Sequence, residues 1–102
     1  MIGVDVAFLT YIKTRKKREL KLPGLVRYTP EQIFFLNAAQ MFCAKLSKED
    51  ALAVRNAKHT YHTVRLIGTL WNSKKFAKAF SCRPGDPMNP IQKCNLWKMS
   101  DY

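Results

Sequence analysis

The chain has 102 residues, 47% of them hydrophobic and 25% charged, which is typical of one folded domain and excludes a disordered or collagen-like chain. Its 18 Lys and Arg outnumber its 7 Asp and Glu, and the net charge of +11 at pH 7 first suggests a polyanionic partner. No apolar run approaches the roughly 18 residues that a membrane-spanning helix needs, and the N-terminal residues lack the pattern of a signal peptide. We therefore expect no membrane segment and no targeting signal in this chain.

The first predicted element is a helix over residues 3–20. Its apolar residues recur at helical spacing, at Val4, Phe8, Tyr11 and Ile12. A basic cluster occupies and follows its second half: Lys13, Arg15, Lys16, Lys17, Arg18 and Lys21. This cluster is either a solvated helix end, which the helix dipole favours, or a polyanion site. The sequence contains no nucleic-acid-binding motif, so no nucleic-acid partner is expected.

A second helix is predicted to begin at Thr29. Thr29 can cap the helix, Pro30 fits the first helical position, and Gln32 completes a capping box. Residues 33–44 are apolar on nearly every side, and a helix with this pattern is meant to be buried.

The remaining elements are shorter. Ser47 begins a third predicted helix, and Ser73 caps another that runs through Phe80. Between them, residues 61–66 are rich in β-branched and aromatic side chains and are predicted to be extended. The proline-rich tail, residues 82–102, is predicted to be an irregular loop ending near Trp97. The expected fold class is mainly α with a short extended segment.

A series of short motifs runs through the chain in a fixed order. The motifs are Leu22-Pro23-Gly24-Leu25, Tyr28-Thr29-Pro30-Glu31-Gln32-Ile33-Phe34-Phe35-Leu36, Ala39-Gln40, Cys43, Arg65-Leu66-Ile67-Gly68-Thr69-Leu70, Asn72-Ser73, Phe76-Ala77-Lys78-Ala79-Phe80, Cys82, Pro87-Met88-Asn89-Pro90, Lys93-Cys94 and Trp97. Together they resemble the C-terminal part of neprilysin-like zinc metallopeptidases, over residues 1–97. Residues 98–102 extend beyond the point where members of that family usually end.

The resemblance implies a fold and an activity. Members of the family have a two-lobed, mostly helical ectodomain with a thermolysin-like catalytic lobe, and they cleave peptides before hydrophobic residues. They are membrane-anchored or secreted, so an extracellular setting is expected for the parent protein. Zinc is the cofactor of the complete enzyme, held by an HExxH helix and a Glu in an ExxxD helix. Neither motif occurs in this sequence. We therefore expect a fragment that binds no zinc, is inactive alone, and has the upstream half of the same peptidase as its partner.

By the same resemblance, four residues belong to the substrate side of the active site. His59 matches a histidine that stabilises the oxyanion, and Arg65 matches an arginine that holds a substrate carbonyl. Phe42 and Leu66 match residues that line the S1′ pocket, although both also suit ordinary core packing. The chain departs from the family at residues 60–62, where Thr60-Tyr61-His62 replaces Ser-Pro-Gly and can alter the loop that aims His59.

The three cysteines, Cys43, Cys82 and Cys94, match family cysteines that form disulfides with upstream partners. A metal site made from these cysteines with His59 and His62 is conceivable, but the spacings fit no known pattern.

The alternative function for the whole chain comes from a different class: a non-catalytic basic binding module or a pseudo-enzyme fragment.

Overall fold

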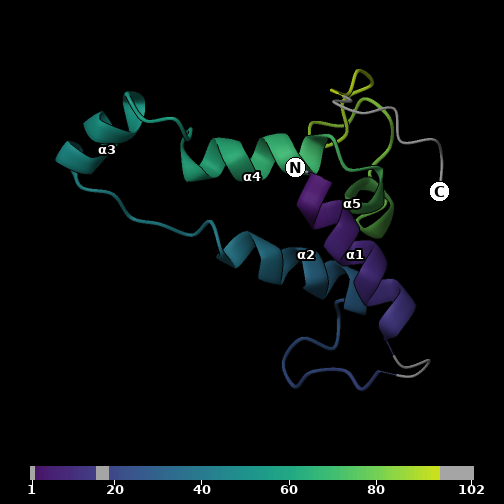
Figure 1. Ribbon diagram of the computed structural model, residues 1–102. Coiled ribbons are helices and arrows are strands. Elements are labelled where there is room, and N and C mark those ends of the chain that lie inside the picture. The colour runs from purple at the N-terminus through teal and green to yellow at the C-terminus, as the bar shows by residue number, and fades with distance from the viewer. Residues whose placement is uncertain (1, 16–18, 95–102) are drawn as a thin grey trace.

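The computed structural model describes residues 2–15 and 19–94. In this part of the chain it contains helices and no strand. The helices are α1 (Ile2–Thr14), α2 (Pro30–Gln40), α3 (Lys48–Arg55), α4 (His62–Trp71) and α5 (Lys74–Ala79). In Figure 1, α1, α2 and α5 lie on one side of the molecule, and α4 leads outward to α3 at the far end. The prediction of a mainly helical fold is confirmed. The predicted C-terminal extension, residues 98–102, and Trp97 lie outside the described residues.

The predicted helix starts are confirmed. The Thr29 hydroxyl accepts a hydrogen bond from the Gln32 backbone N–H at 3.2 Å, and the Gln32 side chain accepts one from the Thr29 N–H at 3.0 Å. This reciprocal pair is the predicted capping box. Ser47 caps α3 through the Asp50 N–H, and Ser73 caps α5 through the Phe76 N–H, both at 3.1 Å. Local sequence signals therefore set where these three helices begin.

The first helix is shorter than predicted. It ends at Thr14 instead of continuing to residue 20, although residues 16–18 lie outside the described part of the chain. Beyond them, Glu19 is not helical, and its carboxylate accepts a hydrogen bond from the Tyr11 hydroxyl at 2.5 Å. In a continuous helix, residues eight apart are separated by about 12 Å along the axis. The chain has thus turned back toward α1 by Glu19.

The prediction of an extended segment at residues 61–66 is wrong. Apart from Tyr61, these residues form the first half of α4, which continues to Trp71. Leu66 and Leu70 recur at helical spacing and pack into the core. Burial of this face outweighs the weak strand preference of Thr63 and Val64, because intrinsic propensities amount to less than about 1 kcal/mol per residue.

The core is a small aromatic cluster where α1, α2 and α5 meet. Phe35 is its centre and is 1% exposed. Its ring stacks on Phe8 at a centroid distance of 4.9 Å and meets the edge of Phe76 at 5.5 Å. A side-chain hydrogen bond from Gln32 to the Ala79 carbonyl, 3.0 Å long, ties α2 to α5. These contacts make α1, α2 and α5 one packed unit.

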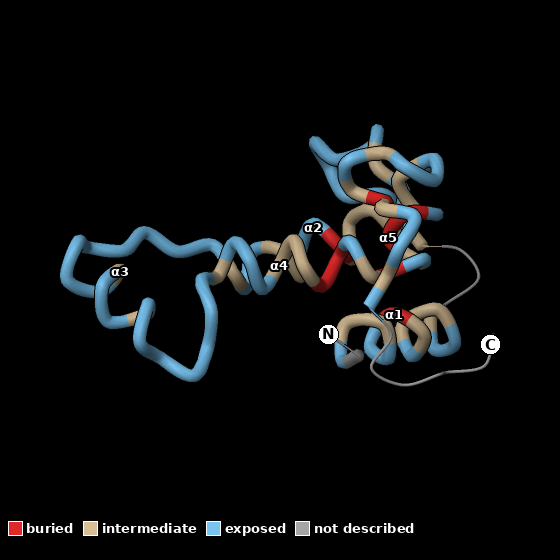
Figure 2. Tube along the Cα trace, turned by 90° about the horizontal axis from the view of Figure 1, so that it is seen from above, coloured by how far each residue is buried: buried red, intermediate tan, exposed pale blue. Residues whose placement is uncertain are grey.

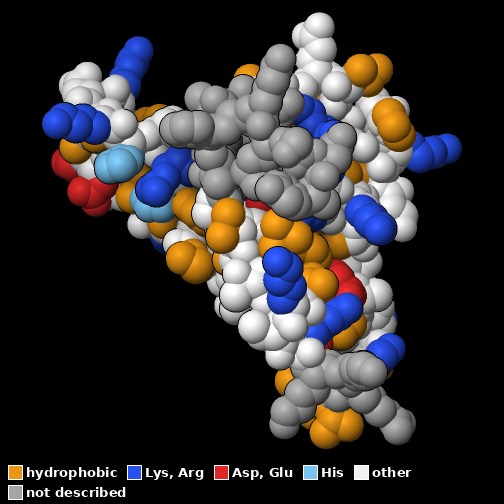
Figure 3. Space-filling model, turned by 45° about the vertical axis from the view of Figure 1, so that its right-hand side comes forward, with side chains coloured by type: hydrophobic (Ala, Val, Ile, Leu, Met, Phe, Trp, Pro, Cys, Tyr) orange, Lys and Arg blue, Asp and Glu red, His pale blue; other side chains and the backbone are white. Residues whose placement is uncertain are grey.

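The second helix is covered on one side only. Phe35 is the buried residue of α2, whereas Leu36 is 40% exposed. The expectation of burial on all sides is therefore not met by the described residues of this chain. Figure 3 shows that hydrophobic side chains also lie on the molecular surface, among Lys and Arg side chains.

The described part of the tail, residues 82–94, is irregular, as predicted. It is held against the end of α4 by two hydrogen bonds. The Lys93 ammonium donates to the Trp71 carbonyl at 2.5 Å, and the Cys94 N–H donates to the Asn72 side chain at 2.6 Å.

No helix in the described ranges is both long enough and apolar enough to cross a membrane.

Candidate functional site

The candidate residues gather around the N-terminal end of α4. Arg65 lies in its first turn and is exposed, and its backbone N–H donates to the Tyr61 carbonyl at 2.9 Å. His59 is exposed in the loop between α3 and α4. Among the described residues, His59 has no hydrogen-bond partner, so its imidazole is open to a ligand.

The structure brings Arg65 and Phe42 together. The guanidinium carbon of Arg65 lies 5.4 Å from the centroid of the Phe42 ring, within the range of a cation–π contact. Phe42 follows α2 in a turn and is half-buried. Two candidate residues from separate parts of the sequence therefore form one surface, in which a cation lies over an aromatic ring.

Leu66 has a different setting. It is half-buried and packs against the aromatic cluster of Phe8, Phe35 and Phe76. The structure thus gives Leu66 the core-packing role that the sequence left open, while its neighbour Arg65 points to the surface. Assignment of Leu66 to a substrate pocket remains a prediction.

Tyr61, which precedes α4, and His62, the first residue of α4, have settings that the sequence did not predict. The Tyr61 hydroxyl donates a hydrogen bond of 2.8 Å to the Ala51 carbonyl of α3. The Nδ1 atom of His62 is buried and has no hydrogen-bond partner in the described part of the chain. Both residues belong to the segment that departs from the family pattern, and this departure was the signal that could have singled them out.

The described residues do not fit a zinc site. They contain no group of three or more His, Cys, Asp and Glu side chains able to hold a metal ion. The thiols of Cys43, Cys82 and Cys94 are free, with Cys43 and Cys94 exposed and Cys82 half-buried. Their pairing with upstream partners remains a prediction.

The described members of the basic cluster are partly engaged within the chain. Arg15 forms an ion pair with Glu31 at 2.5 Å, and the Lys21 ammonium donates to the Val26 carbonyl at 2.8 Å. Lys13 is exposed, and the remaining members, residues 16–18, lie outside the described part of the chain. These internal contacts leave fewer cations available for the polyanion site that the composition suggested.

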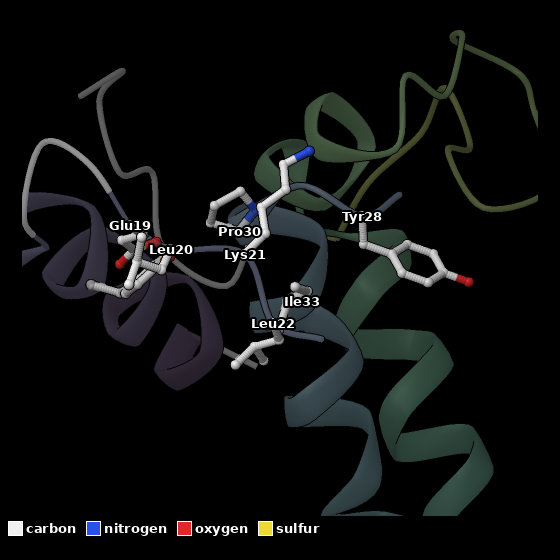
Figure 4. Close-up of a pocket in the computed structure, with 8 residues that line it drawn as sticks. Glu19, Leu20, Lys21, Leu22, Tyr28, Pro30 and Ile33 are labelled. Atoms are coloured by element: carbon white, nitrogen blue, oxygen red, sulfur yellow. Dashed lines mark hydrogen bonds between the residues drawn. The ribbon is translucent and has the colours of Figure 1, made fainter. Parts of the chain in front are cut away.

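An open hollow of about 590 Å³ lies beside this cluster, between α1 and the loop that leads to α2. In Figure 4, Glu19 and Leu20 lie at one end and Tyr28 at the other. Burial, followed by the hydrogen bond to Glu19, raises the pKa of Tyr11 at its wall. None of the four candidate residues lines the hollow, whose walls are Tyr11, Glu19, Leu20, Lys21, Leu22, Tyr28, Pro30 and Ile33.

Comparison with known proteins identifies the class. Peptidase family M13 matches residues 1–96. Neprilysin-2 of Drosophila melanogaster is 44% identical over 98 residues, which cover 93% of this chain and 12% of that protein. Neprilysin-2 of Caenorhabditis elegans is 41% identical over 98 residues, covering 93% of this chain and 13% of that protein. Human neprilysin is 41% identical over 92 residues, covering 89% of this chain and 12% of the human protein.

The chain therefore belongs to peptidase family M13, and it corresponds to a neprilysin-like metallopeptidase segment. It spans about 12% of the length of the curated relatives that it matches.

Proposed function

We propose that this chain supplies the substrate-binding side of the active site in a complete M13 zinc metalloendopeptidase that cleaves peptides before hydrophobic residues. In this proposal His59 stabilises the oxyanion, Arg65 holds a substrate backbone carbonyl, and Phe42 and Leu66 line the pocket for the hydrophobic side chain. The contact between Arg65 and Phe42 is the observation that carries the proposal.

That contact suits the recognition of a peptide. The Arg65 guanidinium lies over the Phe42 ring, and this contact restrains the Arg65 side chain without a hydrogen bond from its N–H donors. A planar fork of donors can then hold a carbonyl oxygen. The apolar ring beside it offers contact to a hydrophobic side chain next to the same carbonyl. One surface thereby binds both a backbone group and a side chain.

His59 has a separate task in the proposal. Attack on a peptide bond places negative charge on the carbonyl oxygen, and a pre-positioned N–H donor stabilises this charge more than it stabilises the ground state. An exposed imidazole without an internal partner among the described residues is free to donate such a hydrogen bond. The position of His59, six residues before Arg65, places both donors at the same end of α4.

Zinc, the cofactor that the family resemblance implies, would activate the attacking water in the complete enzyme. Its ligands are assigned to residues outside this chain, because the sequence contains neither the HExxH nor the ExxxD motif that the resemblance associates with zinc. We accordingly propose that the 102-residue chain is inactive alone and acts together with the rest of the same peptidase. The setting proposed for that enzyme is extracellular, where the three free thiols would pair with other cysteines.

The test is a chimeric peptidase in which this chain replaces the segment of Drosophila Neprilysin-2 that it matches. The substrate is a quenched-fluorescent peptide with Phe or Leu after the cleavage site. His59→Ala should lower kcat by roughly 10²- to 10³-fold, because it removes a donor used mainly in the transition state. Arg65→Ala should chiefly raise KM, because its carbonyl contact exists before the chemical step.

Lys58→Ala is the matched control, since Lys58 is an exposed cation beside His59 and has no proposed role. It should leave both constants unchanged. Zinc content should be equal in all variants. A His59→Ala enzyme with the kcat of the parent chimera would overturn the oxyanion assignment.

A further inference from the structure

Tyr61 connects two helices through two different groups. Its hydroxyl donates to the Ala51 carbonyl of α3 at 2.8 Å, and its own carbonyl accepts the Arg65 N–H of α4 at 2.9 Å. His59 lies two residues before Tyr61, and Arg65 lies four residues after it. The Tyr61 side chain therefore holds the backbone between His59 and Arg65, the two proposed hydrogen-bond donors.

The rest of this loop is weakly held. Lys58, His59 and Thr60 make no hydrogen bond to other described residues, and all three are exposed. The N-terminal end of α4 also lacks a side-chain cap, whereas Thr29, Ser47 and Ser73 cap the other helices that have a described N-cap. The hydroxyl of Tyr61 therefore provides a restraint that neither the loop nor the helix start supplies.

We propose that Tyr61 is a positioning residue, whose hydroxyl holds the loop so that His59 lies at a fixed place relative to Arg65. This inference rests on the proposed function, since it assumes that His59 and Arg65 act on the same substrate. A displacement of about 1 Å in a catalytic group can cost up to roughly 10²-fold in rate, so the restraint has a consequence for kcat.

The segment that carries Tyr61 explains why such an anchor is needed. Thr60-Tyr61-His62 stands where the resemblance predicts Ser-Pro-Gly. Proline restricts its own backbone and that of the preceding residue, and this stiffness is absent here. A long-range bond from the Tyr61 hydroxyl to α3 restricts the same stretch by a different route.

The test uses the chimeric peptidase and the variant Tyr61→Phe, which removes the hydroxyl and keeps the ring. We expect kcat to fall by roughly three- to tenfold, as the loss of one hydrogen bond predicts, with KM within about twofold of the parent. In the His59→Ala background, Tyr61→Phe should cause no further loss, because the group that it positions is gone. Hydrogen exchange of the Arg65 amide, which donates to the Tyr61 carbonyl, should become faster in the chimera.

Tyr28→Phe is the matched control, because the Tyr28 ring lies beside Arg27 and its hydroxyl has no hydrogen bond to a described residue. It should change neither kcat nor exchange of the Arg65 amide. An equal loss of kcat from Tyr61→Phe with and without His59 would overturn the positioning role while leaving the proposed function intact. Unchanged exchange of the Arg65 amide would overturn the anchor itself. A His59→Ala enzyme that keeps the kcat of the parent chimera would instead overturn the proposed function, and the positioning role with it.

Discussion

Two regions of the molecule differ in how they are held together. The aromatic core, made by Phe8, Phe35 and Phe76, joins α1, α2 and α5. The α3 arm, residues 43–61, extends away from it, and its residues are exposed apart from the half-buried Ala51 and Val54. Figure 2 shows the contrast directly, with buried positions around α1, α5 and the inner end of α4 and an exposed tube through α3.

The difference does not lie in local helix signals. Thr29 caps α2 and Ser47 caps α3 through the same kind of side-chain hydrogen bond. Only α2 also places a residue in the core, whereas α3 buries none. A cap sets where a helix begins, but an isolated helix of fewer than about 12 residues is marginal in water, and packing supplies most of its stability. The proposed site spans both regions, because His59 lies in the arm and Arg65 on the helix that enters the core.

The largest expected effect is the loss of Phe35. Phe35→Ala removes the ring that contacts both Phe8 and Phe76, and such a substitution typically costs about 3–5 kcal/mol. This is a large fraction of the roughly 5–15 kcal/mol that stabilises a typical domain. We expect the variant to lose its cooperative urea transition, measured by far-ultraviolet circular dichroism on the reduced 102-residue chain.

Leu52→Ala is the control in the arm, where Leu52 is 64% exposed. It should shift the free energy of unfolding by less than about 0.5 kcal/mol, as surface substitutions usually do. If both variants lowered the transition equally, the stability of the chain would not reside in the aromatic core.

A smaller effect is expected from removing the helix caps, and it should differ between Thr29 of α2 and Ser47 of α3. Thr29→Ala should lower the global free energy of unfolding by about 1 kcal/mol, because α2 unfolds only with the core. Ser47→Ala should leave the global transition unchanged and instead increase the local unfolding of α3, seen as faster amide exchange at residues 48–55. A global shift from Ser47→Ala would mean that the arm folds as part of the core.

The helix starts could be predicted from sequence because they depend on residues close together in the chain. Thr29, Ser47 and Ser73 each accept a hydrogen bond from a backbone N–H three residues later. The helical state of residues 62–66 could not be predicted in the same way. It depends on Leu66 and Leu70 reaching a core built by distant residues, and a short β-branched stretch does not show that contact.

In the candidate site, too, contacts between residues distant in the sequence could not be predicted. The roles proposed for His59 and Arg65 came from the family resemblance. The match to peptidase family M13 supports that resemblance. The contact of Arg65 with Phe42 joins separate parts of the chain, so spacing alone did not reveal it. The Tyr61 anchor was missed because a hydroxyl bound to a backbone carbonyl leaves no residue pattern at the accepting position.

The smallest expected effect concerns the ion pair that links the end of α1 to the first turn of α2. Burial alone would raise the pKa of Glu31, but a hydrogen bond from its own backbone and the contacts with Arg15 outweigh burial and lower it below the usual value of 4.5. A carboxylate whose pKa is lower in the folded state stabilises the fold above the unfolded pKa, and this contribution is lost as the pH falls through the folded pKa. We therefore expect the stability of the parent chain to decrease more steeply below pH 4.5 than that of Glu31→Gln.

The matched control is Glu49→Gln, which alters the first turn of α3 at a residue with no ion pair among the described residues. Urea midpoints measured between pH 6 and pH 3 should show the parent slope in this variant and a shallower slope in Glu31→Gln. The difference should be smaller than the effect of Thr29→Ala, because the side chains of Arg15 and Glu31 are each 29% exposed and solvent screens their attraction. Equal slopes in Glu31→Gln and Glu49→Gln would show that the ion pair adds nothing to the core region beyond what its aromatic packing supplies.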